Sequence, residues 1–219
     1  MALMAGRSSR TRGTVVRFDA LEAIAHLRDR DLKLGSLMDR VGEFRLKLNP
    51  ELSPFEALSE SIIYQQITGR AAETIAGRFR EKVGEGRFPS PERVLEASDT
   101  ILRESGLSRG KVAALRDLAA KTLDGTVPPL ARLRAMEDEA VVERLTVVRG
   151  IGRWTAEMFL IFRLGRPDVL PIHDYGVRKG YQRAFRTRGL PEPASIARRG
   201  ERWRPFRTVA SWYLWRALE

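Results

Sequence analysis

A chain of 219 residues, 43% of them hydrophobic and none of them cysteine, is long enough to bury a core and excludes disulfides, iron–sulfur clusters and thiolate metal sites. The two histidines, His26 and His173, are too far apart in sequence to form a local metal-binding motif. No apolar run approaches the roughly 18 residues that a membrane span requires, so we expect a cytoplasmic protein with no membrane partner.

The net charge of +11 is concentrated at the two ends of the chain. Residues 1–17 contain four arginines and no acid, residues 174–219 contain eleven basic and four acidic residues, and the segment between them is neutral. Such one-sided clustering favours a polyanionic partner. Because residues 1–17 show no apolar periodicity, we expect a basic, mobile arm there, which either has no function or touches that partner.

Apolar residues recur at helical spacing over residues 18–48 and predict two short helices. His26 falls in the first of them, and we interpret it as a surface histidine or one with satisfied hydrogen bonds. Ser53 and Glu56, with a proline between them, match a capping box and predict a helix to about Gln66.

Further helices are predicted from start and stop signals. One with an apolar stripe ends at the glycines around residue 85, and Ser90 followed by Pro91 repeats the signal of a cap and a proline. Ser108 caps the next helix, which Gly125 stops. Acidic residues at 137–139 then favour the start of the helix that leads into the central part of the chain.

The stretch from Leu145 to Ala156 is that central part. It predicts a helix end, a turn at Gly150 and Gly152, and a second helix that runs to about Leu164. Two such glycines let the chain turn with positive φ and expose its amides, and the positive end of the second helix points into the same gap. The pattern predicts a phosphate-binding hairpin, although glycines also close helical hairpins that bind nothing.

Asp174 follows Pro171 and precedes a helical pattern that ends near Gly189, which places the carboxylate at a helix N-terminus. Most aspartates there are plain N-caps, but a carboxylate held in this way also suits a developing positive charge, and both roles are compatible. A short helical piece over residues 193–203 and a last helix opened by Pro205 follow. With about ten helical segments and no period-two strand, the sequence predicts an all-α fold.

The hairpin, the spaced aspartate, the helices over residues 53–79 and the final motif at residues 203–207 together resemble the helix-hairpin-helix (HhH-GPD) DNA glycosylases. The chain is most similar to their 3-methyladenine DNA glycosylase II, or AlkA/Mag, branch. The resemblance implies a two-lobed all-α fold over residues 18–219, double-stranded DNA with damaged bases as the partner, and no required cofactor. Lobe one is expected at about 53–170, and lobe two at about 18–52 plus 171–219.

Trp154 decides the reaction type that the resemblance implies. In relatives that also cut the DNA backbone, a lysine at this position attacks the sugar as a Schiff-base nucleophile, which tryptophan cannot do. The implied enzyme is therefore monofunctional, hydrolyses the N-glycosidic bond of an alkylated base such as 3-methyladenine, and leaves an abasic site. Asp174 is the implied catalytic carboxylate, which stabilises positive charge on the sugar and orients the attacking water.

Because the base must leave the DNA stack, the resemblance also implies a wedge and a pocket. Gln66 matches the wedge. The implied base pocket, some of which can equally be hydrophobic core, comprises Tyr64, Gln65, Trp154, Met158, Tyr175, Trp212 and Trp215. The implied phosphate contacts are Gly150, Gly152, Arg153, Thr155, Arg178 and Lys179. The main-chain carbonyls that match a sodium or potassium site are those of Thr146, Val148 and Ile151.

The chain departs from the family pattern in three places. Fewer than fifty residues precede Asn49, too few for the N-terminal β domain of longer members. Arg149 stands where proline is frequent, and His173 where a second acid can lie. Two alternatives stay open: a non-catalytic hairpin module that binds duplex DNA, and a glycosylase for mispaired or oxidised bases. We expect a monomer, associated with the nucleoid if the protein is bacterial.

Overall fold

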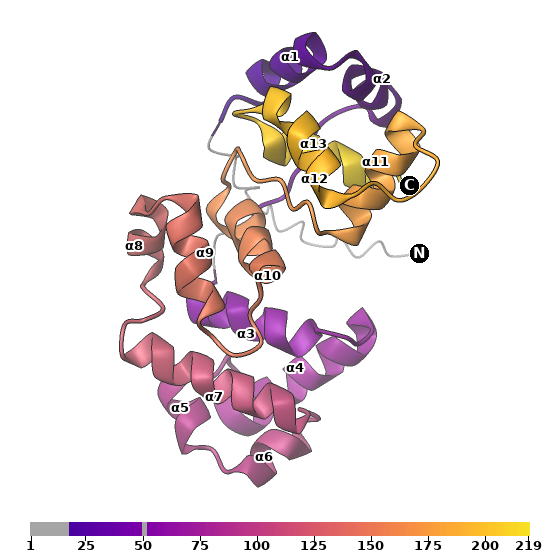
Figure 1. The fold of residues 1–219 in the computed structure, drawn as a ribbon. Helices are drawn as coiled ribbons and strands as arrows, with labels where there is room; N and C mark the ends of the chain where they lie inside the picture. Colours follow the sequence, from indigo (N-terminus) through magenta and orange to yellow (C-terminus); the bar gives the residue numbers. More distant parts are fainter. Residues whose placement is uncertain (1–17, 50–51) are drawn as a thin grey trace, which may run out of the picture.

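The computed structural model describes residues 18–49 and 52–219, and every regular element within these ranges is a helix. The expected all-α, two-lobed fold is confirmed (Figure 1). None of the described helices is long and apolar enough to cross a membrane. The expectation of a mobile arm falls on residues 1–17, which lie outside the described residues.

Lobe one contains the middle of the chain and has its own hydrophobic core, whose buried residues extend from Phe55 to Val169. Its longest helices, α4 and α7, pack with α3 around Leu58, Phe79 and Leu115, all fully buried. The helices of this lobe are α3 (Pro54–Tyr64), α4 (Gly69–Gly84), α5 (Pro91–Glu96), α6 (Asp99–Glu104), α7 (Arg109–Leu123), α8 (Leu130–Ala135), α9 (Asp138–Thr146), α10 (Arg153–Met158) and the π-helix η1 (Phe159–Leu164).

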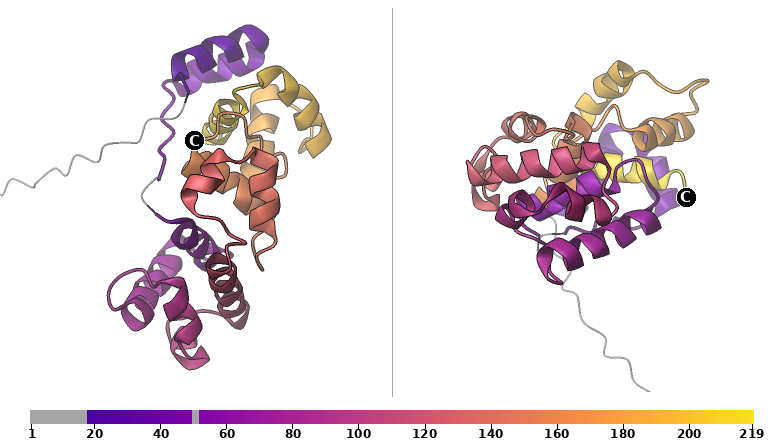
Figure 2. Two further views of the ribbon diagram at one scale, coloured as in Figure 1. Left: turned by 90° about the vertical axis from the view of Figure 1, so that its left-hand side faces the viewer. Right: turned by 90° about the horizontal axis from the view of Figure 1, so that it is seen from below.

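Lobe two combines both ends of the described chain around a second core, whose buried residues come from 23–38 and 170–214. Figure 2 shows its indigo and its orange-to-yellow helices gathered on one side, with the magenta helices of lobe one on the other. This lobe consists of α1 (Ala20–Arg30), α2 (Leu32–Val41), α11 (Tyr175–Phe185), α12 (Pro193–Gly200), the 3-10 helix η2 (Glu201–Trp203) and α13 (Arg207–Arg216). The lobe boundaries given from sequence stay a prediction, which the two cores support.

Local capping determines where several helices begin. The Ser53 hydroxyl accepts the Glu56 amide while the Glu56 carboxylate accepts the Ser53 amide, so the predicted capping box is present. Ser108 likewise caps α7. The end of α3 was predicted about two residues too late: the helix ends at Tyr64, because Gln66 adopts a left-handed conformation with φ of 59°.

Three other expectations about lobe two were wrong. The helix after Asp174 ends at Phe185 and not near Gly189, because Arg186 adopts the left-handed conformation. The last helix begins at Arg207 and not at Pro205. At Arg207, the Asp168 carboxylate accepts hydrogen bonds from the main-chain amide and the guanidinium. His26 is half-buried and its hydrogen bonds are not satisfied: its ring packs edge-on against Phe206, and its Nε2 has no hydrogen-bond partner among the described residues.

Candidate active site

Asp174 lies where the chain passes from lobe one into α11. It is the N-cap of that helix, and its Oδ1 accepts the amide hydrogen of Val177 at 2.7 Å. The plain capping role is therefore present. The hydrogen bond from Val177 uses only part of the acceptor capacity of Oδ1, so the carboxylate can accept hydrogen bonds from other groups as well.

Two tryptophans, one from each lobe, complete the surroundings of this carboxylate. Trp154, on α10, donates its indole N–H to Asp174 Oδ2 at 2.7 Å, and Trp215, at the end of α13, donates to Asp174 Oδ1 at 2.8 Å. Asp174 forms no ion pair within the described ranges. It is thus fixed in position by neutral donors only, and no cationic side chain among the described residues pairs with it.

Gly176 makes this arrangement sterically possible, and sequence reasoning missed it. A Cβ atom on Gly176 would lie 2.8 Å from Cδ1 of Trp215 and 3.0 Å from Oδ1 of Asp174. Any other residue would push the indole away from the carboxylate. The only available sequence signal was a glycine in the first turn of a helix, where it lowers helix propensity.

The hairpin joins α9 to α10 through a turn at residues 147–152. Gly150 has φ of 80°, which a glycine adopts without strain, and Gly152 is the N-cap of α10 with no side-chain capping bond. The first amides of α10 are therefore not capped by a side chain and remain able to bind an acceptor. The second helix reaches Leu164 as predicted, but it changes from α to π geometry at Phe159.

Two side chains from other parts of lobe one hold the hairpin turn. Asp117 on α7 accepts the Arg149 amide at 2.7 Å, and Gln65 donates to the Gly150 carbonyl at 2.9 Å. Burial alone would raise the pKa of Asp117, but the hydrogen bonds from the Arg149 amide and from Lys121 lower it overall. The turn is thus fixed by a carboxylate that stays charged. Sequence reasoning missed Asp117, which is 32 residues from its partner.

A cavity of about 650 Å³ opens beside Trp154. Tyr64, Gln65, Gln66, Trp154 and Met158 all line it, so the structure brings five of the predicted pocket and wedge residues to one place. Gln66 is exposed at its rim.

The other three predicted pocket residues are elsewhere. Trp215 stacks on Phe162, which lines the cavity, with ring centroids 5.8 Å apart. Trp212 is only 7% exposed and packs edge-on against Phe44 in the core of lobe two. Tyr175 is 67% exposed and follows Asp174 directly. Their roles as base contacts stay predictions.

Three of the predicted phosphate-contact side chains already have hydrogen-bond partners within the protein. Arg153 forms a bidentate pair with Glu139 on α9, with both nitrogen–oxygen distances 2.7 Å. Arg178 donates to the Pro191 carbonyl and Lys179 to the Gln182 side chain. Thr155 is only 6% exposed.

Glu157 is a further titratable group on the hairpin helix. Its side chain is 10% exposed and lies 3.4 Å from the Arg153 guanidinium. Burial raises the pKa of Glu157 to about 7, and the nearby charges of Glu139 and Asp174 contribute in the same direction, while Arg153 opposes the shift. The hairpin therefore contains a carboxyl group that titrates near neutral pH.

The proposed cation ligands are main-chain carbonyls in the hairpin. Thr146 is the last residue of α9, so its carbonyl has no partner within the helix. The Val148 carbonyl accepts the Ile151 amide at 3.0 Å and retains a second lone pair. The cation site at these carbonyls stays a prediction. No cluster of three or more histidine, aspartate or glutamate residues that could hold a metal occurs in the part of the chain that the structure describes.

Comparison with known proteins places this geometry in a family. The family model described as HhH-GPD superfamily base excision DNA repair protein matches residues 60–205, which include the hairpin, Trp154 and Asp174. The chain belongs to the HhH-GPD superfamily.

Individual members of the HhH-GPD superfamily align over most of this chain. DNA-3-methyladenine glycosylase 1 of Schizosaccharomyces pombe is 36% identical over 89% of this chain and 86% of its own. A structure of that organism's 3-methyladenine DNA glycosylase, Mag1, in complex with abasic DNA has a TM-score of 0.79 and covers 89% of this chain and 95% of the Mag1 chain. A DNA-3-methyladenine glycosidase from Bacillus halodurans is 32% identical, with a TM-score of 0.82 over 93% of this chain and 91% of its own.

Proposed function

We propose that this HhH-GPD protein is a monofunctional DNA glycosylase that excises alkylated bases such as 3-methyladenine from duplex DNA. The observation that carries the proposal is the Asp174 carboxylate, fixed by the Trp154 and Trp215 indoles without a cationic partner among the described residues. The relatives named as 3-methyladenine glycosylases support the same substrate class.

Breaking the N-glycosidic bond builds positive charge on the deoxyribose, so a fixed, uncompensated carboxylate stabilises the transition state more than the ground state. Asp174 is positioned in advance by three hydrogen bonds and needs no reorganisation during the reaction. It also has acceptor capacity left to orient a water molecule. An N-alkylated purine is cationic or nearly so and leaves without a general acid, so a single carboxylate suffices.

The pocket chemistry supports a cationic or electron-poor base. Trp154 is 48% exposed, so much of its ring surface beside the cavity is free to stack, and a tryptophan face attracts a cation. Tyr64 and Met158 provide further contact surface on the same cavity. Gln66, which is exposed and lines the same cavity, would fill the space that the extruded nucleotide leaves.

Hydrolysis without cleavage of the backbone follows from Trp154, which has no amine with which to form a Schiff base. The product would be an intact strand with one abasic site. The hairpin would hold a phosphate 3′ to the lesion through the amides after Gly152, with Arg153, Arg178 and Lys179 as charged contacts. Arg153 has to leave Glu139 to do so.

The protein would act as a monomer without a required cofactor. Sodium or potassium bound by the carbonyls of Thr146, Val148 and Ile151 would add positive charge next to the phosphate that the hairpin holds. The residues of this chain would then only orient those three carbonyls, through the turn that Gly150 makes.

A product assay on the wild-type protein tests the proposal. A duplex with one methylated purine should acquire alkali-labile sites, the undamaged duplex should not, and sodium borohydride should trap no protein–DNA adduct. DNA binding without alkali-labile sites would identify a non-catalytic module, excision only of mispaired or oxidised bases would reassign the substrate, and a trapped adduct would contradict the monofunctional mechanism.

A further inference from the structure

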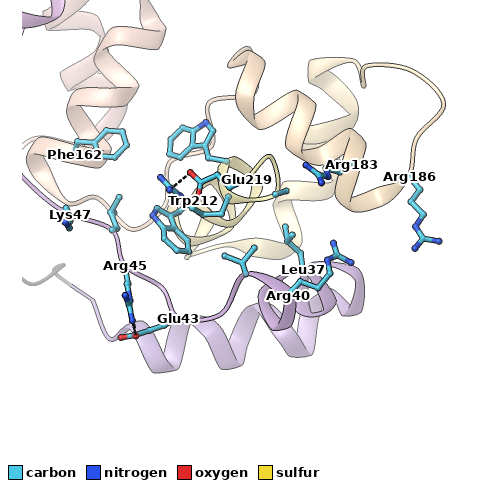
Figure 3. Close-up of a pocket in the computed structure, with 15 residues that line it drawn as sticks. Leu37, Arg40, Glu43, Arg45, Lys47, Phe162, Arg183, Arg186, Trp212 and Glu219 are labelled. Atoms are coloured by element: carbon cyan, nitrogen blue, oxygen red, sulfur yellow. Dashed lines mark hydrogen bonds and ion pairs between the residues drawn. The ribbon is translucent and has the colours of Figure 1, made fainter. Parts of the chain in front are cut away.

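A large hollow on lobe two adjoins the candidate active site, and two predicted pocket residues, Trp212 and Trp215, line it. It measures about 1120 Å³ and is lined by residues of α2, the connection after it, the ends of α11 and α13, and the chain after α13. Figure 3 shows Arg45 and Lys47 on one side of it and Arg40, Arg183 and Arg186 on the other. We call this hollow the basic groove.

The basic groove has an excess of positive charge. Two of its lining cations are paired with acids that also line it: Arg45 with Glu43 at 2.8 Å, and Arg216 with Glu219. The other four cations have no ion pair or side-chain hydrogen bond within residues 18–49 and 52–219; they are Arg40, Lys47, Arg183 and Arg186.

Stabilisation of helix ends does not account for this arrangement. Arg40 and Arg183 lie in the last turns of α2 and α11, where a cation stabilises a helix by about 0.3–1 kcal/mol. Lys47, however, lies outside any helix, and all four unpaired cations line one hollow from three segments. Like charges gathered in this way repel one another unless an anion lies between them.

The basic groove adjoins the candidate active site. Phe162 lines both the groove and the cavity beside Trp154, and Trp215, which also lines the groove, donates its indole hydrogen to Asp174. A DNA duplex whose extruded nucleotide lies against Asp174 therefore enters the protein next to the groove. The charge of the groove excludes the arginine-rich N-terminal arm as its occupant, because that arm is itself basic.

We infer that the basic groove binds the phosphate backbone of the same DNA molecule that occupies the active site, in the stretch flanking the extruded nucleotide. This inference rests on the proposed function, since it takes DNA at Asp174 as given. Contacts of this kind are independent of base sequence and depend steeply on salt, because each neutralised phosphate releases counterions. The groove would thus add affinity for DNA without taking part in the excision step.

Two charge-matched triple variants test this. The groove variant carries Arg40→Gln, Arg183→Gln and Arg186→Gln. The control variant carries three equal substitutions at arginines of lobe two that do not line the groove and have no ion pair within the described residues: Arg188→Gln, Arg198→Gln and Arg202→Gln. Both lose three positive charges, so a difference between them reports the place of the charge and not its amount.

The measurement is fluorescence anisotropy of a labelled duplex of about 25 base pairs, roughly 85 Å, with one central abasic-site analogue, over a range of sodium chloride concentrations. The groove variant should bind about tenfold or more weakly than the control at 0.1 M salt, with a log–log salt slope shallower by about 2 to 3. Its single-turnover excision rate at saturating protein should equal that of the wild type. Equal affinities and slopes for the two variants would overturn the inference.

A titration of the protein with duplex, at concentrations above the dissociation constant, distinguishes two origins of the DNA backbone in the groove: the molecule in the active site or a second DNA segment. One duplex per protein supports the flanking stretch of a single DNA molecule. Two duplexes per wild-type protein, reduced to one in the groove variant, would overturn that assignment in favour of a second DNA segment. Wild-type binding without excision would contradict the proposed function alone, because the comparison of the two variants relies only on binding.

Discussion

Two aspartates, Asp31 and Asp174, occupy equivalent local positions and have opposite electrostatic surroundings. Each caps a helix of lobe two through the amide three residues ahead, and each accepts an indole N–H, Asp31 from Trp203 and Asp174 from Trp215. The Asp31 side chain is 1% exposed and forms a bidentate ion pair with Arg199, both distances 2.7 Å.

Asp174 has a second indole, from Trp154, in the place where Asp31 has a guanidinium. A buried carboxylate with a cationic partner holds two segments of the fold together, whereas a carboxylate fixed by neutral donors retains a charge that another cation can use. An N-cap aspartate can therefore either form a structural ion pair or remain without a cationic partner. Which of the two occurs depends on the second partner of the carboxylate, which is an arginine at Asp31 and a tryptophan at Asp174.

Removal of the Asp31 charge should produce the largest loss of stability. Asp31→Asn leaves the Arg199 guanidinium without its buried partner, which costs about 3–5 kcal/mol. Urea unfolding at pH 7 measures this loss, and the excision rate of the folded protein should stay within about twofold of the wild type. An unchanged free energy of unfolding would break the distinction between the two aspartates.

Low pH should remove the stability that the ion pair between Asp31 and Arg199 contributes. Burial tends to raise the pKa of Asp31, but the hydrogen bonds from Arg199 and Trp203 lower it overall. A lowered pKa in the folded state contributes stability that is present above the pKa of the unfolded chain, about 3.9, and is lost as pH falls through the folded value. Below pH 4, the free energy of unfolding of the wild type should therefore approach that of Asp31→Asn. A difference between the two proteins that does not change with pH would contradict this.

Displacement of Trp215 should reduce catalysis more than stability. A Cβ atom at Gly176 would overlap the indole that holds Asp174. We expect Gly176→Ala to lower the single-turnover excision rate about 10- to 100-fold, because a shift of about 1 Å at a catalytic group has effects of this size. Gly189→Ala, where a Cβ atom meets nothing within 4 Å, is the matched control. Equal rates for the two variants would show that the position of Trp215 is unimportant.

The smallest effect concerns Glu157. Its pKa is raised to about 7 in the folded protein, chiefly by burial, so its contribution is full below the unfolded pKa of about 4.3 and is lost as pH rises through 7. The wild type should lose about 2–3 kcal/mol of stability relative to Glu157→Gln between pH 5 and pH 8. Parallel pH dependences for the two proteins would show that Glu157 is ionised throughout.

Local signals in the sequence predicted most of the secondary structure. A capping residue and the helix that it starts are neighbours in the chain, so the box at Ser53 and the cap at Ser108 could be recognised without a structure. The Gly150–Gly152 turn was predicted for the same reason. The left-handed Gln66 could not be, because nothing in its residue type requires positive φ.

Local signals predicted the hairpin turn and the place of Asp174 at a helix N-terminus, and the family resemblance added the other site residues. Trp154 and Asp174 were identified by their motif, but the hydrogen bond between Asp174 and Trp215 joins residues 41 positions apart. Asp117, which holds the hairpin turn, and Gly176, which admits the indole, contribute through long-range contacts alone. Helical periodicity has no information about which helix faces which.

The single-turnover excision rate of Asp174→Asn, measured together with its free energy of unfolding, tests the central claim most directly. Asparagine caps helices as well as aspartate does, so stability should change by only about 1 kcal/mol. The rate on a duplex with one methylated purine should fall at least about a thousandfold, because the negative charge that opposes the developing cation is gone. A variant that keeps the wild-type rate would contradict the account.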